Sequence, residues 1–205
     1  MKIIKFGDRG PLVELLQTAL RRAGEQPGKT DGIFGQQTKN AVVAFQKRMG
    51  LSPDGIVGTN TTQTLMPWYT GYYLHKLRRG DTLWKLAQGY GTTLDAILTA
   101  NPNINPENLQ VGSTVTVPLA FDVVPTTINY SSQLIAYCVR GLNARYPFTG
   151  AGEIGKSVMG KPLWYLSFGS GENKVFYNAS HHANEWITTP VLLKFFEDLC
   201  KVYVS

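Results

Sequence analysis

The stretch Asp31-Gly32-Ile33-Phe34-Gly35-Gln36-Gln37-Thr38 returns further along the chain as Asp54-Gly55-Ile56-Val57-Gly58-Thr59-Asn60-Thr61. Both copies read Asp-Gly-Ile-x-Gly-x-x-Thr. An Asp-Gly pair favours a turn, the two apolar positions that follow suit a core, and the second glycine allows a tight entry into a helix. The repeat therefore predicts two turns, each of which leads into a helix.

Helical patterns lie on both sides of the first copy. Gly10-Pro11 opens one of them, since proline is tolerated in the first turn of a helix. Its apolar stripe contains Leu12, Leu15, Leu16, Ala19 and Leu20. A second helical pattern follows the first copy, with Ala41, Val42, Phe45 and Met49 at helical spacing. After the second copy we expect only a short helix that ends near Leu65, and a linker over residues 67–72.

Residues 1–67 resemble the small three-helix peptidoglycan-binding domain found on many bacterial wall hydrolases. The resemblance rests on the two copies of the repeat and on Ala44-Phe45-Gln46 between them. It implies a three-helix fold that binds wall polymer, and it assigns no individual ligand contacts.

Residues 73–119 show a different order of elements. Tyr73-Leu74-His75-Lys76-Leu77 alternates like a strand, and Arg79-Gly80-Asp81-Thr82 is typical of a turn in which Asp81 or Thr82 caps a helix. Two short helices are expected around residues 83–87 and 94–98, and residues 111–118 are expected to form the closing strand of a two-stranded sheet. The predicted order is strand, helix, helix, strand.

This order, with Gly-Asp-Thr-Leu and Asn-Pro-Asn-Ile at their spacings, resembles a LysM module from end to end. The resemblance implies binding of glycans that contain N-acetylglucosamine, such as peptidoglycan, in a shallow groove between two loops. The contacts that it implies are Gly80, Asp81, Thr82 and Leu83 on one side and Asn101, Pro102, Asn103 and Ile104 on the other. The alternative is that Asp81, Thr82 and Asn101 only cap and turn the backbone. Two wall-binding modules in one chain would act together by avidity.

The third segment, residues 121–205, mixes helical and strand patterns. A helix is predicted over residues 131–142, strands over 163–168 and 175–179, and a long helix from Val191 onward. Between the second strand and the long helix stands His181-His182-Ala183-Asn184-Glu185-Trp186. Histidine and carboxylate side chains are zinc ligands, and a separation of three or four residues places either histidine on the same face of a helical turn as Glu185. Spacing alone does not choose between the two histidines.

The third segment resembles the N-terminal part of the zinc carboxypeptidase-type peptidases (family M14), an α/β fold. The resemblance rests on Ile154-Gly155-Lys156-Ser157, the apolar strand and His182-Ala183-Asn184-Glu185-Trp186-Ile187. It implies that His182 and Glu185 ligate Zn²⁺ and that His181 has no ligand role. Digestive members have arginine where this chain has Asn184, which argues against simple C-terminal exopeptidase specificity.

The chain offers only part of such a site. A catalytic zinc keeps three protein ligands and an open position. The resemblance places the third ligand, the general base and the arginines that bind the substrate carboxylate further downstream, so no catalytic residue is assigned here. The one other histidine, His75, is expected to be structural or at the surface. The chain would then be a fragment of a longer enzyme, one of two chains that complete the site, or a natural truncation.

The composition and charge of the chain indicate which kinds of binding partner and which cellular location to expect. The net charge of +6 suits an anionic polymer, but no cluster of Lys and Arg resembles a nucleic-acid-binding surface. No apolar run approaches the ~20 residues of a membrane helix, and the N-terminus does not read as a secretory signal. We therefore expect a cytoplasmic, spore-associated or wall-associated protein. Cys138 and Cys200 stand in apolar settings and are expected to be buried free thiols.

Two functions follow from these patterns. The arrangement resembles bacterial γ-D-glutamyl-L-diamino acid endopeptidases, which implies a zinc metallopeptidase that cuts peptidoglycan stem peptides. We expect this chain alone to be inactive, because its site is incomplete. The alternative is a non-catalytic peptidoglycan-binding protein.

Overall fold

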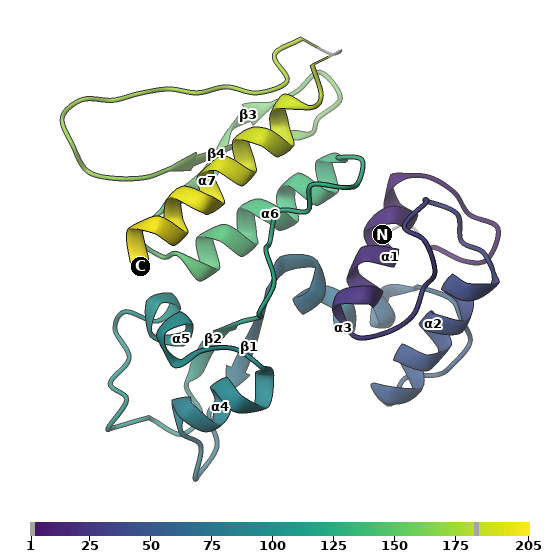
Figure 1. Ribbon diagram of the computed structural model, residues 1–205, viewed down its shortest axis with the longest axis horizontal. Helices are drawn as coiled ribbons and strands as arrows, with labels where there is room; N and C mark the ends of the chain where they lie inside the picture. Colours follow the sequence, from purple (N-terminus) through teal and green to yellow (C-terminus); the bar gives the residue numbers. More distant parts are fainter. Residues whose placement is uncertain (1–2, 183–184) are drawn as a thin grey trace. The chain divides into compact units, whose positions relative to one another are not determined.

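The computed structural model describes residues 3–182 and 185–205 of the 205-residue chain. The chain forms two compact units (Figure 1). The first contains the residues up to Tyr69 together with Thr127–Leu134, and the second contains Thr70–Thr126 and Ile135–Ser205. Residues 127–134 group with the first unit, where the backbone and side-chain nitrogens of Asn129 donate hydrogen bonds of 2.7 and 2.8 Å to the Glu14 carboxylate.

The first unit is built from the predicted three helices: α1 (Pro11–Arg22), α2 (Gln36–Arg48) and α3 (Thr59–Thr70). Isolated backbone bridges join Ile4 to Val57 and Arg9 to Ile33, so the N-terminal residues are tied to both copies of the repeat. The apolar stripes of the helices and the repeats share one core. Its most buried side chains are Val13, Leu16, Leu20, Phe34, Val42, Phe45, Val57 and Leu65.

Each copy of the repeat folds around a buried glutamine from the preceding helix. The Gln17 side-chain nitrogen donates to the carboxylate of Asp31, the carbonyl of Ile33 and the hydroxyl of Thr38, at 3.0–3.1 Å. Gln46 makes the same three bonds to Asp54, Ile56 and Thr61. Both glutamines are 1% exposed, and a buried amide is stable only when it is hydrogen-bonded. The glutamine thus links each turn to the helix that precedes it.

The prediction that the third helix ends near Leu65 and that residues 67–72 form a linker is wrong. Helix α3 continues through Pro67 to Thr70. Trp68 is 9% exposed, and its ring lies edge-on to Phe45 with 5.5 Å between centroids. Burial of a tryptophan contributes more than the hydrogen bond that a proline removes from a helix, so packing extends the helix past the sequence signal.

The LysM-like part of the second unit has the predicted order: β1 (Tyr72–Lys76), α4 (Leu83–Tyr90), α5 (Leu94–Ala100) and β2 (Thr114–Pro118). The strands pair antiparallel, with His75 opposite Val115. Thr82 and Thr93 cap the two helices with their side-chain oxygens. One compact core joins both helices to the sheet, and it contains Leu77, Leu83, Leu86, Ala87, Ile97, Val115 and Val117.

The remainder of the second unit contains α6 (Ser132–Arg145), which begins in the first unit, β3 (Gly150–Lys156), β4 (Pro162–Ser167) and α7 (Thr188–Val204). Strands β3 and β4 form an antiparallel hairpin with an irregularity between Glu153 and Gly155. The prediction that Cys138 and Cys200 are buried thiols is confirmed, because both are 0% exposed and neither forms a disulfide.

The prediction of an apolar strand over residues 175–179 is wrong. These residues belong to the long connection between β4 and α7, and the sheet described here has only the strands β3 and β4 (Figure 1). Val175, Phe176 and Tyr177 are 73%, 79% and 64% exposed. A strand exists only where a neighbouring backbone accepts and donates its hydrogen bonds, and none of the described residues does so here.

Candidate functional site

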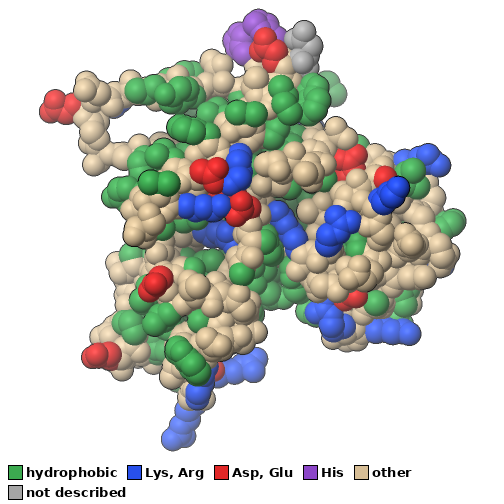
Figure 2. Space-filling model, in the orientation of Figure 1, with side chains coloured by type: hydrophobic (Ala, Val, Ile, Leu, Met, Phe, Trp, Pro, Cys, Tyr) green, Lys and Arg blue, Asp and Glu red, His purple; other side chains and the backbone are tan. Residues whose placement is uncertain are grey.

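His182 and Glu185 lie side by side in the turn that precedes α7. The Nδ1 atom of His182 is 3.1 Å from Oε1 of Glu185, and their side chains are 68% and 49% exposed. The backbone nitrogen of Glu185 donates to the carbonyl of His182 at 3.0 Å, which closes the turn. Figure 2 shows histidine side chains at the surface of the molecule beside an acidic side chain. Ala183 and Asn184 lie outside the described residues, so the expectation about specificity at Asn184 stays a prediction.

Hydroxyl groups hold this turn against the start of α7. The backbone nitrogen of Ser180 donates to the Thr188 hydroxyl at 2.7 Å, and the Ser180 hydroxyl is 2.6 Å from that of Thr189. The Thr188 hydroxyl in turn donates to the carbonyl of Glu185 at 2.8 Å. Ser180 has a positive φ of 54°, a conformation that needs such local support in a residue other than glycine. The backbone of Glu185 is therefore fixed to the helix that follows it.

The separation of the two side chains fits a shared metal ion. Zinc bonds nitrogen and oxygen ligands at about 2.0–2.2 Å, so two ligands of one tetrahedral ion lie about 3.3–3.4 Å apart. The observed 3.1 Å is close to that separation. Among residues 3–182 and 185–205, however, no three His, Cys, Asp or Glu side chains come together as a metal site. The contact is also a hydrogen bond between the two side chains, and their role as zinc ligands stays a prediction.

His75 is not available as a third ligand, because both of its ring nitrogens are engaged in the LysM-like part. Nδ1 lies 3.0 Å from the Tyr90 hydroxyl, and Nε2 lies 2.9 Å from Oδ2 of Asp81. The hydrogen bond from His75 is the main reason that the pKa of Asp81 is lowered, and the backbone nitrogen of Arg78 adds to it. His75 thus ties β1 to α4 and to the turn between them.

Most of the polar side chains proposed to contact glycan also have structural bonds. The Thr82 hydroxyl caps α4, and Asn101 bonds the backbone of Ile97 and Thr116 with its side-chain amide. Leu83 is 2% exposed and lies in the core. Gly80 has a positive φ of 88°, and its carbonyl accepts a hydrogen bond from Lys85. In the second loop, Pro102 and Asn103 are exposed.

Two cavities in the first unit lie at equivalent places, one beside each copy of the repeat. The larger, of about 290 Å³, is lined by Gln46, Asp54, Ile56 and Thr61 among others. The smaller, of about 190 Å³, is lined by the equivalent Gln17, Asp31, Ile33 and Thr38 among others. Each combines a carboxylate with an isoleucine, Ile56 or Ile33, that is about 40% exposed. The pKa of Asp54 is lowered by hydrogen bonds from the backbone of Ile56 and then from Gln46, and the pKa of Asp31 is lowered by those from Gln17 and then from the backbone of Ile33.

Comparison with known families identifies three modules in the predicted order. Residues 9–65 match the family described as a putative peptidoglycan binding domain, residues 75–118 match the LysM domain, and residues 135–205 match the zinc carboxypeptidase family. The chain carries a peptidoglycan-binding domain, a LysM domain and a zinc-carboxypeptidase-like segment. His182 and Glu185 fall within the last of these, and the candidate glycan loops fall within the LysM domain.

Proteins to which parts of the chain are similar include an endopeptidase and a spore cortex-lytic enzyme. The chain is 38% identical to γ-D-glutamyl-L-diamino acid endopeptidase 1 of Lysinibacillus sphaericus over 60% of its own length and 44% of that protein's. It is 57% identical to the uncharacterized protein YqgT of Bacillus subtilis over 27% of the chain and 15% of the relative. It is 39% identical to a spore cortex-lytic enzyme of B. subtilis over 40% of the chain and 28% of the relative. The chain thus spans less than half the length of each of these relatives.

The sequence patterns did not predict two features, the buried role of the two glutamines and the exposure of one tryptophan. The buried glutamines Gln17 and Gln46 precede the two repeats at different distances, so a search for strict periodicity passes over them. Trp84 in the LysM domain is 63% exposed, although its neighbour Leu83 is buried. Tryptophan is among the more buried residues on average, and exposed aromatic side chains are enriched at binding surfaces. In the sequence, the position of Trp84 directly after the Gly80–Leu83 loop could have indicated a role in glycan binding.

Proposed function

We propose that the chain is the wall-binding part and half of the zinc site of a peptidoglycan hydrolase, a metallopeptidase that cleaves the γ-D-glutamyl-L-diamino acid bond of stem peptides. The peptidoglycan-binding and LysM domains hold the protein on the wall polymer. The observation that carries the proposal is the 3.1 Å approach of His182 to Glu185 inside the zinc-carboxypeptidase-like segment of a chain with two wall-binding domains.

The residues of this chain would hold the metal rather than perform the proton transfers. His182 and Glu185 present a nitrogen and an oxygen to one point, and the hydroxyls of Thr188 and Ser180 keep the supporting turn in place. A zinc ion at that point would polarise the scissile amide and lower the pKa of a bound water. Among the residues that the structure describes, no third His, Cys, Asp or Glu side chain joins this pair.

A second candidate function follows from that incompleteness. Since the described residues supply only two neighbouring ligands, the chain by itself also fits a non-catalytic peptidoglycan-binding protein. No helix in the described part of the chain combines the length and the apolar character needed to cross a bilayer. Wall or spore association would then come from the two binding domains.

Digestion of purified muropeptides, with and without a chelator, separates the two functions. We expect the 205-residue chain alone to leave them intact, and a polypeptide that adds a further histidine and glutamate to cleave them in a chelator-sensitive way. Cleavage by the chain alone would refute the claim that its site is incomplete. Failure of the chain to pellet with insoluble peptidoglycan would count against both functions.

Zinc titration tests which histidine is the ligand. Loss of a residue that merely supports a ligand weakens metal binding by about 10–100-fold, so we expect at least that loss in His182→Ala. Histidine ring signals observed by NMR during the titration report the site directly. His181→Ala is the matched control, since its side chain is the adjacent imidazole, with 5.1 Å between ring centroids. Equal losses in both variants would contradict the assignment to His182.

Trp84 provides a test of the LysM surface. We expect Trp84→Ala to weaken binding to insoluble peptidoglycan roughly tenfold, which corresponds to about 1.4 kcal/mol, because a flat indole can pack on a sugar ring. Co-sedimentation at increasing peptidoglycan measures the change. Leu74→Ala is the control, since Leu74 is equally exposed, at 64%, in the same domain. An equal effect of both substitutions would show that Trp84 has no special role.

A further inference from the structure

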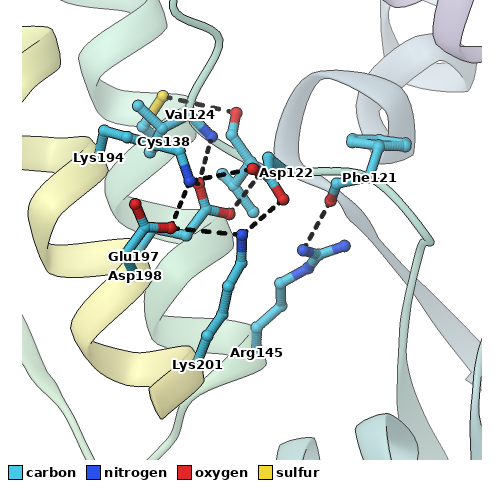
Figure 3. Close-up of polar contacts among 10 residues, drawn as sticks. Phe121, Asp122, Val124, Cys138, Arg145, Lys194, Glu197, Asp198 and Lys201 are labelled. Carbon is cyan, nitrogen blue, oxygen red and sulfur yellow. Dashed lines mark hydrogen bonds and ion pairs between the residues drawn. The ribbon is translucent and has the colours of Figure 1, made fainter.

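Arg145, at the end of α6, binds both ends of the LysM domain. Its guanidinium donates to the carbonyl of Gly71, immediately before β1, at 3.1 Å, and to that of Leu119, immediately after β2. A further bond of 2.8 Å reaches the carbonyl of Phe121 (Figure 3). The side chain is only 7% exposed. Arginine is almost never buried unless it is paired, and these three carbonyl groups are its partners. One side chain of the peptidase-like segment therefore holds the entry and the exit of the LysM domain.

Glu197, from α7, holds the next part of the same connection. It is 0% exposed, and its two oxygens accept hydrogen bonds of 2.7 and 3.2 Å from the backbone nitrogens of Val123 and Val124. Both valines are buried in turn, at 0% and 2% exposure. A flexible linker is polar and solvated, whereas this one has its backbone bonded and its side chains packed. The connection is part of a core.

A cluster of charges surrounds this contact. Lys201 and Lys194 each reach Asp122, at 2.7 and 3.0 Å, and both also lie beside Asp198 (Figure 3). Lys194 is 3.9 Å from Glu197, so the buried carboxylate has a cation nearby. Ion pairs at the surface contribute little singly, but a network around a buried pair of hydrogen bonds excludes water from them.

A glycine in α6 allows the close approach of the two parts. A side chain at Gly141 would collide with the carbonyl oxygen of Thr70, the residue before Gly71, and with Val123. Glycine inside a helix costs about 1 kcal/mol relative to alanine, so its presence at a contact point has a packing reason. Helix α6 thus touches both the residue that precedes the LysM domain and the connection that follows it.

We infer that Arg145 and Glu197 lock the LysM domain onto the peptidase-like segment as one rigid body, so that the domain positions bound glycan relative to the His182–Glu185 turn instead of acting as a tether. A tethered module raises the local concentration of its target over the whole reach of the linker. A rigidly held module instead fixes the position of the bound polymer relative to the His182–Glu185 turn. The purpose of the lock rests on the proposed function, whereas its rigidity does not.

Amide ¹⁵N relaxation on the 205-residue chain tests the lock without zinc or peptidoglycan. We expect residues 73–118 and 135–205 to share one rotational correlation time in the wild type. In Arg145→Ala we expect that equality to be lost, with the LysM amides reporting the shorter time. Arg140→Ala is the matched control, since Arg140 is exposed on the same helix, and it should keep the equality.

Two further measurements separate loss of the lock from loss of fold. The signals of the LysM core should persist in Arg145→Ala, and the variant should still pellet with peptidoglycan. If Arg145→Ala does not fold, Arg145→Lys and Glu197→Gln take its place, because each keeps the size of the side chain and loses part of its hydrogen bonds. Different correlation times in the wild type, or equal ones in every folded variant, would overturn the inference. Failure of peptidoglycan binding with the equality intact would count against the proposed function alone.

Discussion

Phe45→Ala is expected to lower the free energy of unfolding of the first unit by about 3–5 kcal/mol, the usual range for a large core aromatic. Phe45 is 0% exposed, and its ring supports Trp68 in the part of α3 that continues beyond Leu65. The substitution therefore opens a cavity and also removes the packing that extends the helix through Pro67. We expect the amides at the end of α3 to lose protection first.

Denaturant unfolding followed by NMR measures this loss for each unit separately. Phe6→Ala is the control within the same unit, since Phe6 is 55% exposed, and a change within about 0.5 kcal/mol is expected there. If Phe45→Ala behaved like Phe6→Ala, the contact between Phe45 and Trp68 would not be what stabilises the end of α3.

Glu197→Ala is expected to destabilise the second unit by about 2–6 kcal/mol. The substitution removes the carboxylate that accepts buried hydrogen bonds from the backbone nitrogens of Val123 and Val124, and the loss of a buried partner costs about 1–3 kcal/mol for each group. Asp198→Ala is the matched control, because Asp198 is the next residue of α7 and pairs with Lys194 and Lys201 while its side chain is 53% exposed. We expect the control to lose less than about 1 kcal/mol.

The pH dependence of the same site gives an independent measurement. Burial raises the pKa of the Glu197 carboxyl above its ordinary 4.5, so the folded state holds this proton more tightly than the unfolded state. The resulting contribution to stability is complete below the unfolded pKa and is lost as the pH rises through the folded pKa. Glu197→Gln, which does not titrate, should therefore gain stability relative to the wild type over that window. A difference that is constant with pH would contradict a raised pKa.

Local patterns were sufficient for most of the elements. The three helices of the first unit and the strand-helix-helix-strand order of the LysM domain follow from apolar periodicity, turn residues and caps such as Thr82, all of which act within a few residues. Spacing predicted that His181 or His182 lies beside Glu185, and the family resemblance chose His182, whose Nδ1 atom is 3.1 Å from the Glu185 carboxylate. Their role as zinc ligands stays a prediction.

The failures share a dependence on residues distant in sequence. Residues 175–179 have the composition of a strand, but a strand also needs a partner, and the described chain places none beside them. Residues 67–70 have the composition of a linker, but Trp68 finds Phe45 and the helix continues. Arg145 and Glu197 appear as ordinary surface charges in the sequence, and only their backbone partners, more than seventy residues away at Gly71 and Val123, explain their burial.

The sequence by itself determined the three modules and their order, through motifs that resemble known families, and it placed two histidines within a turn of Glu185 through their spacing. The tertiary structure alone decided where α3 ends, that residues 175–179 stay unpaired, and that the LysM domain is bonded to the peptidase-like segment through Arg145 and Glu197. The physical reason is that hydrogen bonding and burial depend on which surfaces meet. Contacts between residues distant in the sequence form only when the complete fold brings their surfaces together.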